Sequence, residues 1–243
     1  QWMLNVREEG SVECGLPRDK MFEGIKAVGF DLDGTFLNTH VDYQAVDLAD
    51  KDACRRHGIP FDELEFTTVK RLRQPIRDWL ISHGRENEIP IVEKEIDSEL
   101  TRIELEHVDE AKPFPGSLEC VRELKSRGYK VGLLTRGSLE YGDTVLKMMG
   151  IRDEFDVVVG RDYTNYDHAK PSPKAMQYFA DELGVKASEI LYLGDNRTDY
   201  YSARDAGAVF VGVLSGSMDR EGWLKEDPEM TMVQYAGDVL SLL

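Results

Sequence analysis

Two kinds of hydrophobic pattern alternate along the chain and divide it into regions. Short runs of consecutive apolar residues, typical of strands buried on both faces of a parallel sheet, occur before residue 31 and again after residue 129. Between them, residues 41–108 carry apolar positions at helical spacing and contain no convincing strand. Beyond residue 116 the helical and strand patterns alternate, which predicts right-handed crossovers and a parallel sheet with helices on both faces.

The same pattern predicts individual elements, with glycines and prolines marking their ends. Strands are expected at residues 25–31, 130–134, 155–160, 190–193, 208–213 and, more weakly, 231–233. Helices are expected at 41–57, across 61–83 with an interruption at Gln74 and Pro75, and at 91–108, 117–127, 139–149, 172–183, 198–206 and the C-terminus. In the first of these, the spacing places Val41, Ala45, Leu48, Ala49 and Ala53 near one apolar face.

The order of these elements predicts an α/β protein: a Rossmann-like parallel sheet with an inserted all-helical subdomain. We expect the core to comprise residues 25–37 and 113–243, and the inserted helical domain to comprise residues 38–112. Residues 1–24 show no clear pattern and are expected to form an extension of unknown role.

Composition narrows the classes of function. The formal net charge of −16 disfavours non-specific binding to nucleic acid or anionic membranes, and no apolar run has the length of a membrane span. Cys14, Cys54 and Cys120 are scattered, without the spacing of a disulfide framework or a metal site. A reducing, cytoplasmic location is the simplest expectation.

The first predicted strand runs directly into two carboxylates, Asp31 and Asp33, followed by Gly34. In open α/β sheets, ligands bind at this end of the strands, and residues i and i+2 of an extended chain point the same way. Two carboxylates so close repel each other, and a bound Mg²⁺ would relieve that repulsion. The alternative is an ordinary turn, because Asp-Gly is common turn chemistry. This stretch alone leaves both interpretations open.

Three later strand ends also carry polar groups suited to a phosphate and a cation. Thr135 begins a turn whose hydroxyl and backbone N–H groups could cradle an anion, and Lys170 lies just before a helix. Asp195 and Asp199 are four residues apart at a helix start and therefore face the same side. Each has an ordinary explanation when taken alone, as a helix N-cap or a solvated lysine. Their combination is much more specific.

These four segments resemble the four sequence motifs of the haloacid dehalogenase superfamily, in the same order. The matching residues are Asp31-Leu32-Asp33-Gly34-Thr35, Leu133-Leu134-Thr135, Lys170-Pro171-Ser172-Pro173 and Gly194-Asp195-Asn196-Arg197-Thr198-Asp199. The helical insert resembles the small cap domain of the phosphoglycolate phosphatase-like branch of that superfamily. The resemblance extends from about residue 25 to the C-terminus and excludes residues 1–24.

The resemblance implies a role for each catalytic residue. Asp31 is expected to be the nucleophile that forms an aspartyl-phosphate, and Asp33 the general acid and base. Thr135 and Lys170 are expected to hold the phosphoryl oxygens. Their neighbours Arg136 and Gly137 are candidate substrate-binding residues; Arg136 replaces the asparagine of many relatives and could instead point to solvent.

The resemblance also implies a Mg²⁺ site. Asp31, Asp195 and Asp199 are expected to hold the ion through their carboxylates, together with the backbone carbonyl of Asp33. The cation is needed physically because a dianionic phosphate must approach several carboxylates.

Within the superfamily, Asp33 distinguishes between reactions. Family dehalogenases lack this second carboxylate and need no metal, and the phosphonate-cleaving relatives replace it. We therefore expect a phosphatase acting on a small phosphorylated metabolite. A phosphomutase and a non-catalytic phosphate-binding regulatory protein remain alternatives, and the protein is expected to be a monomer or a homodimer.

Substrate choice is expected to depend on a basic cluster in the cap, residues 70–77. Arg73, with Arg71 or Lys70, could grip a second anionic group on the substrate, since arginine binds carboxylates and phosphates bidentately. The alternative is a solvated helix face that pairs with nearby acids. Gln74 occupies the position where relatives carry a glycine before the proline, so the loop geometry of those relatives need not apply here.

Overall fold

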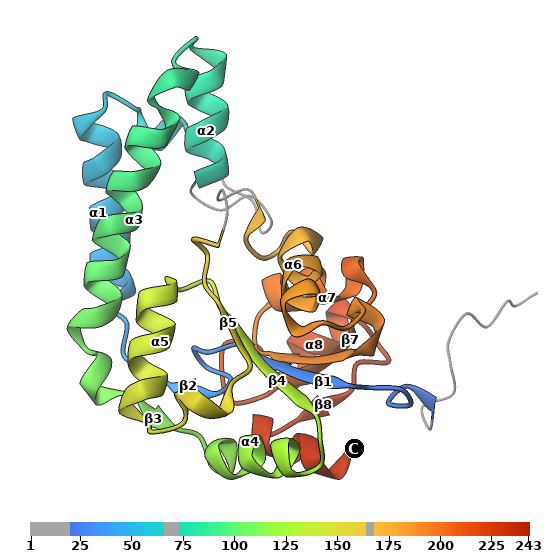
Figure 1. Cartoon of the computed structure of the whole chain (residues 1–243). Coiled ribbons are helices and arrows are strands. Elements are labelled where there is room, and N and C mark those ends of the chain that lie inside the picture. The colour runs from blue at the N-terminus through green and yellow to red at the C-terminus, as the bar shows by residue number, and fades with distance from the viewer. Residues whose placement is uncertain (1–19, 66–72, 164–167) are drawn as a thin grey trace, which may run out of the picture.

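A six-stranded parallel sheet forms the centre of the protein in the computed structural model, which describes residues 20–65, 73–163 and 168–243 (Figure 1). The strand order is β5-β4-β1-β6-β7-β8. The strands are β1 (Ala27–Phe30), β4 (Lys130–Leu134), β5 (Val157–Val159), β6 (Ile190–Gly194), β7 (Val209–Val213) and β8 (Met232–Val233).

The path of the chain places a ligand-binding crevice at β1. From β1 the chain continues to β4 and β5 on one side, then crosses over and adds β6, β7 and β8 on the other side. Where the strand order reverses in this way, the loops beyond the two neighbouring strands separate and leave room for a ligand. The predicted fold class, an α/β protein with a parallel sheet, is confirmed.

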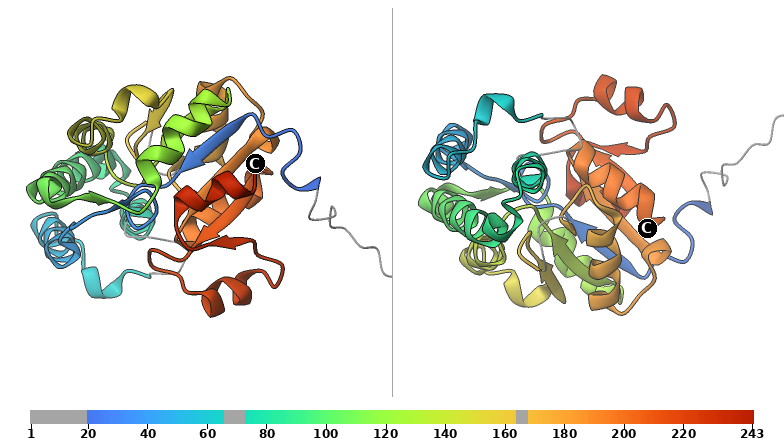
Figure 2. Two further views of the ribbon diagram at one scale, coloured as in Figure 1. Left: turned by 90° about the horizontal axis from the view of Figure 1, so that it is seen from below. Right: turned by 90° about the horizontal axis from the view of Figure 1, so that it is seen from above.

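Side chains on β1 alternate between the two faces of the sheet, and helices cover both faces. Val28 and Phe30 pack into one apolar cluster, whereas Ala27 packs into the other. The first face is covered by α4 (Ser117–Ser126), α5 (Leu139–Met148) and the 3-10 helix η8 (Ala236–Ser241), and the second by α6 (Pro173–Leu183), α7 (Arg197–Ala206) and α8 (Arg220–Glu226) (Figure 2). Gly29 is required on the second face, because a Cβ there would lie 2.6 Å from the ring of Phe179.

The cap consists of α1 (Tyr43–Arg56), α2 (Arg73–Ser82) and α3 (Ile89–Glu106), which extend away from the sheet in Figure 1. These helices share an apolar cluster of their own, formed by Ala53, Cys54, Ile59, Leu64, Ile76, Leu80, Val92 and Ile96. The two connections to the core pair as an antiparallel ribbon, β2 (Leu37–Asn38) with β3 (Lys112–Pro113). Strands of two residues are too short to produce a period, so the sequence pattern could not predict them.

Three expectations about secondary structure were wrong. Gln74 and Pro75 do not interrupt a helix, because both lie inside the described part of α2. In α1 the apolar face is rotated from the expected one: Leu48 is exposed to solvent, whereas the acidic residue Asp50 is buried. The helix α8 was not predicted, since it is short and contributes one large buried side chain, Trp223.

Residues 1–19, Lys70 and Arg71 lie outside the described residues, so the predictions about the N-terminal extension and these two basic side chains are not addressed. No helix in the described part of the chain combines the length and the apolar content that crossing a membrane requires.

A buried arginine links the core to the cap. Arg161, in the loop after β5, is almost completely buried and reaches α3, where its guanidinium donates to Asp97 at 2.7 Å and also binds Glu104. It further donates to the hydroxyl of Thr101 at 2.9 Å. Glu104 in turn accepts a bond from the backbone N–H of Ser138 at the start of α5. These contacts hold one end of the long cap helix against the core.

We predict that Arg161→Met lowers the free energy of unfolding by about 3–5 kcal/mol, because it leaves the buried Glu104 without its counter-ion. Arg102→Met is the matched control. Arg102 pairs with Glu99 on the same helix but its side chain is 60% exposed, so a loss of about 0–1 kcal/mol is expected. Urea unfolding of both variants measures the difference, and equal losses would contradict a structural role for the Arg161 contacts.

Candidate active site

Lys170 lies where the ends of three neighbouring strands meet. Its ammonium group donates to Asp31 Oδ1 at 2.8 Å, to Asp199 Oδ1 at 2.5 Å and to the hydroxyl of Tyr192 at 2.8 Å. It also donates to the carbonyl of Leu134 at 2.9 Å. The residue is only 2% exposed, so its charge depends on these partners rather than on water.

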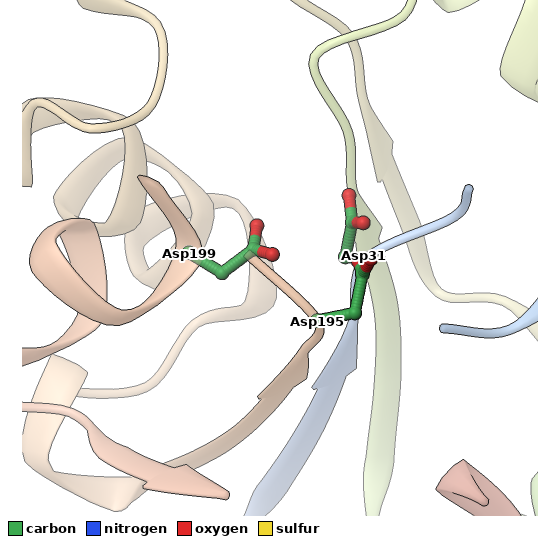
Figure 3. A group of neighbouring side chains, drawn as sticks. All are labelled: Asp31, Asp195 and Asp199. Carbon is green, nitrogen blue, oxygen red and sulfur yellow. The ribbon is translucent and has the colours of Figure 1, made fainter. Parts of the chain in front are cut away.

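Three carboxylates converge beside this lysine. Asp31 follows β1, Asp195 follows β6 and Asp199 lies in the first turn of α7, and their side chains point toward one another (Figure 3). One oxygen from each lies within 4.8 Å of the others. A compact group of buried carboxylate oxygens is the donor set that Mg²⁺ prefers. The residues therefore fit the predicted cation.

Burial and mutual repulsion raise the pKa values of this group. The pKa of Asp31 is raised to about 7, chiefly by burial and additionally by the charges of Asp195 and Asp33, against the opposing charge of Lys170. Burial and the charge of Asp31 raise the pKa of Asp199 to about 6, again against Lys170, and burial also raises the pKa of Asp195. Burial alone would lower the pKa of Lys170, but its carboxylate partners outweigh that effect and hold it above the ordinary value.

Backbone geometry brings Asp195 close to the first loop. Gly34 has a φ of +82°, and a Cβ on it would lie 2.6 Å from Asp195 Oδ2. Asp195 is held by the hydroxyl of Thr35, which donates to its Oδ1 at 3.1 Å, and by the N–H of Ser217, which donates to its Oδ2 at 2.7 Å. Only glycine adopts this conformation readily while leaving room for the carboxylate.

The carboxyl group of Asp33 is held separately from this cluster. Its Oδ1 accepts bonds from the hydroxyl of Thr39 at 2.5 Å and from the hydroxyl of Tyr141 at 2.7 Å. Thr39 lies in the connection to the cap, and Tyr141 lies on α5. Burial raises the pKa of Asp33, whereas these two bonds lower it. Asp33 thus lies at the junction of core and cap.

The turn after β4 matches the expected anion cradle only in part, because the backbone N–H groups of Gly137 and Ser138 already donate to Thr135 and Glu104. The hydroxyl oxygen of Thr135 accepts a bond from the N–H of Gly137 at 3.0 Å, so its hydrogen can be donated to a ligand. Ser138 caps α5 by accepting the N–H of Tyr141. Arg136 lines a cavity beside these residues, and its backbone carbonyl accepts a hydrogen bond from Arg161.

A cavity of about 800 Å³ joins these groups to the cap. Arg73 is among its lining residues but is buried and paired with Asp97 at 3.0 Å, so its charge is already partly compensated. The cap contributes further lining residues that the sequence analysis did not select, including Asp50, Phe61, Leu100 and Glu104.

Several of the contacting residues could not be identified from sequence. Thr39, Tyr141 and Ser217 contact the catalytic carboxylates from separate elements, and no spacing along the chain marks them. Asp50 did carry a signal: it is an acid on the inward face of α1, beside Ala53 and Cys54. Asp50 was not selected because the sequence pattern had been interpreted with a different face of α1 turned inward.

Comparison with known proteins identifies the family. Residues 25–207 match the family model described as haloacid dehalogenase-like hydrolase, so the chain belongs to that family, and the predicted resemblance is confirmed. It is 28% identical over 199 residues to a phosphoglycolate phosphatase of Neisseria gonorrhoeae, an alignment that covers 81% of this chain and 83% of the relative. It is 27% identical over 207 residues to an N-acetylmuramic acid 6-phosphate phosphatase of Pseudomonas aeruginosa, covering 81% and 85%.

Among solved structures, a β-phosphoglucomutase from Clostridium difficile has a TM-score of 0.60 at 20% identity, covering 88% of this chain and 93% of the other. At this identity the likeness concerns the fold alone.

We predict that Mg²⁺ raises the melting temperature, and that it does so more at about pH 7.5 than at about pH 5.5. Raised carboxyl pKa values mean that the folded protein binds protons more tightly than the unfolded chain between about pH 4 and 7. Without a cation, this group therefore contributes less stability as the pH rises through that window. Mg²⁺ binds the ionised group and competes with those protons.

The variant Asp195→Asn should lose most of the Mg²⁺-induced rise in melting temperature. Asp205→Asn, which alters an exposed acid on α7 that pairs with Arg204, should retain it. Calorimetry at both pH values provides the measurement. Equal rises in the two variants would contradict a cation site at the Asp31, Asp195 and Asp199 cluster.

Proposed function

We propose that this protein is a Mg²⁺-dependent phosphatase that hydrolyses a small phosphorylated metabolite through an aspartyl-phosphate on Asp31. The observation that carries this proposal is the contact between Lys170 and Asp31 beside two further buried carboxylates, at the end of the central strand. Family membership and the phosphatase relatives identify the chain as an enzyme, a phosphoric monoester hydrolase.

In the proposed first step, a carboxylate oxygen of Asp31 attacks the phosphorus of the ester. The new bond joins that oxygen to phosphorus, and the bond between phosphorus and the alcohol oxygen breaks. Asp33 gives its proton to the departing alcohol oxygen. Lys170 and the hydroxyl of Thr135 donate hydrogen bonds to the phosphoryl oxygens and hold the group in line with Asp31.

In the second step, a water molecule attacks the phosphorus of the aspartyl-phosphate. Asp33, now ionised, takes a proton from that water, and the bond between phosphorus and the Asp31 oxygen breaks. Inorganic phosphate leaves, and both carboxyl groups return to their starting states. One residue can serve as acid and then as base because its pKa is raised by burial but moderated by the bonds from Thr39 and Tyr141.

Asp31, Asp195 and Asp199, with the backbone carbonyl of Asp33, are the residues that would hold Mg²⁺. The bound ion would supply positive charge that offsets the repulsion between the phosphate and these carboxylates. We also propose a cytoplasmic location, because Cys54 and Cys120 are both unpaired and buried.

The alternative is a phosphomutase, which returns the phosphoryl group to its sugar instead of to water; the Clostridium difficile neighbour is named as such an enzyme. Both reactions use the same first step, so the residues around Asp31 do not separate them. A panel of sugar phosphates does: a mutase converts one sugar phosphate into an isomer, whereas a phosphatase releases inorganic phosphate. A non-catalytic phosphate-binding protein would do neither.

The direct test incubates the protein with p-nitrophenyl phosphate, with and without Mg²⁺. We expect Mg²⁺-dependent release of phosphate that Asp31→Asn lowers by about 1,000-fold or more, because an amide cannot act as the nucleophile. The control is Asp153→Asn, an exposed acid in the 3-10 helix Arg152–Glu154, which should keep the activity. Tight phosphate binding with no turnover of any ester would refute the proposal.

Tyr141→Phe tests the support of Asp33. Removing the hydroxyl deletes one of two hydrogen bonds to the carboxylate, and a bond to a charged group contributes about 1.5–3 kcal/mol. We expect kcat to fall by about ten-fold or more with KM little changed, because the tyrosine contacts Asp33 rather than the phosphoryl group. Steady-state kinetics separates the two constants. A rise in KM with unchanged kcat would instead place Tyr141 in substrate binding.

A further inference from the structure

Asp50 is a buried acid on the cap side of the candidate active-site cavity. It lies on α1, lines the cavity and is only 7% exposed. Among the described residues, none provides a hydrogen-bond partner for its Oδ1. Buried side-chain oxygens are nearly always hydrogen-bonded, because removing them from water without a partner is unfavourable. Asp50 is thus an acceptor that the folded chain itself leaves unsatisfied, at the wall of the cavity.

The position of Asp50 on its helix argues against a role in packing alone. Ala53 and Cys54 lie one turn further on the same face and belong to the apolar cluster of the cap. An apolar residue would therefore pack well at position 50. The carboxyl group has instead a pKa raised to about 7, chiefly by burial. Proteins retain such locally unfavourable residues mainly where function requires them.

The location of Asp50 indicates which part of a substrate it would meet. The phosphoryl site is formed by Asp31, Thr135 and Lys170 at the strand ends, whereas Asp50 belongs to the cap. The same cavity connects the two. An ester whose phosphate is held by Lys170 would therefore present its alcohol portion to Asp50.

The charges around Asp50 select the chemistry of that portion. The guanidinium groups of Arg73 and Arg161 already act on Asp50 and oppose the rise in its pKa, so the site contains cations before a ligand binds. A neutral hydroxyl group can donate to the carboxyl group of Asp50 without adding charge. Ile96 and Leu100 provide apolar surface in the same cavity for a carbon skeleton.

We propose that Asp50 determines substrate specificity by accepting a hydrogen bond from a hydroxyl group of the leaving alcohol. The preferred substrates are then phosphate monoesters of polyhydroxylated alcohols, such as sugars or polyols, rather than simple alkyl phosphates. This inference rests on the proposed phosphatase function and names the substrate class of that site.

The test compares three phosphate esters of one chain length: a hexitol 6-phosphate, n-hexyl phosphate and 6-aminohexyl phosphate. We expect the wild-type protein to have the highest kcat/KM with the hexitol ester. In Asp50→Ala the ratio of hexitol to hexyl kcat/KM should fall by about ten-fold or more, since a hydrogen bond to a charged group is lost. In Asp50→Asn, which keeps one acceptor oxygen, the ratio should fall less.

Asp52→Asn is the matched control. Asp52 lies two residues away on α1, is half exposed and pairs with Arg55, so this variant should keep the wild-type ratio. Melting temperatures of the three variants are measured alongside. Because Asp50 is buried as an acid, Asp50→Asn should melt no lower than the wild type near neutral pH.

Three results would overturn the inference. The hexitol ester could show no advantage in the wild type, a comparison that needs no variant to fold. The ratio could be equal in wild type and Asp50→Ala, and an equal loss of kcat/KM with all three esters would then indicate a structural role. The wild type could instead prefer 6-aminohexyl phosphate and lose that preference in Asp50→Ala. Asp50 would then bind an ammonium group of the substrate rather than a hydroxyl group.

The same experiment separates this inference from the function on which it rests. If p-nitrophenyl phosphate is hydrolysed with Mg²⁺ and the hexitol ratio does not change, only the role of Asp50 is refuted. If the wild type hydrolyses none of the esters, the phosphatase function is refuted, and the inference fails with it.

Discussion

The charge imbalance around Lys170 is the constraint on which the rest of the site depends. One buried ammonium group contacts Asp31 and Asp199, while Asp195 and Asp33 lie close by. Burial raises the pKa values of all four carboxyl groups, and repulsion from neighbouring carboxylates adds to this for Asp31, Asp195 and Asp199. A single positive charge cannot compensate four ionised carboxylates at a buried site. Protons supply the missing positive charge at low pH, and in the proposed function a divalent cation supplies it at neutral pH, before a phosphoryl group approaches Asp31.

The topology of the sheet explains why these groups meet. β1 is flanked by β4 and β6, so the loops that carry Asp31, Thr135 and Asp195 begin at the same edge. Parallel strands end in register there, and the reversal of strand order beside β1 leaves room between the loops. The cap closes this edge from the other side, and Arg161 anchors the long helix α3 to the core. In the proposed function, the residues at the edge of the sheet carry out the chemistry and the cap contributes to the choice of substrate.

The sequence predicted the sheet and the candidate catalytic positions. Consecutive apolar residues marked the strands, and polar residues at their ends marked Asp31, Thr135 and Asp195. Lys170 lies well beyond β5 and was identified through the motif that it resembles. Contacts made across the fold had no such signal. Tyr141 reaches Asp33 from α5, and only the packing of that helix determines the contact. The paired strands β2 and β3 are too short to show a period. In α1, the pattern was interpreted with Leu48 on the buried face, which left Asp50 off that face. Periodicity alone does not determine how a helix is rotated about its own axis.

The central claim is that Asp31 becomes covalently phosphorylated and that Asp33 is needed to remove the phosphoryl group. Acid quenching during turnover of p-nitrophenyl phosphate, followed by mass spectrometry of the peptide that contains residue 31, tests it most directly. Nitrophenolate leaves without help from an acid, so Asp33→Asn should still form the intermediate but hydrolyse it slowly. The account predicts a phosphorylated Asp31 that accumulates in Asp33→Asn and is absent in Asp31→Asn. Turnover by the wild type with no phosphorylated peptide in Asp33→Asn would contradict it.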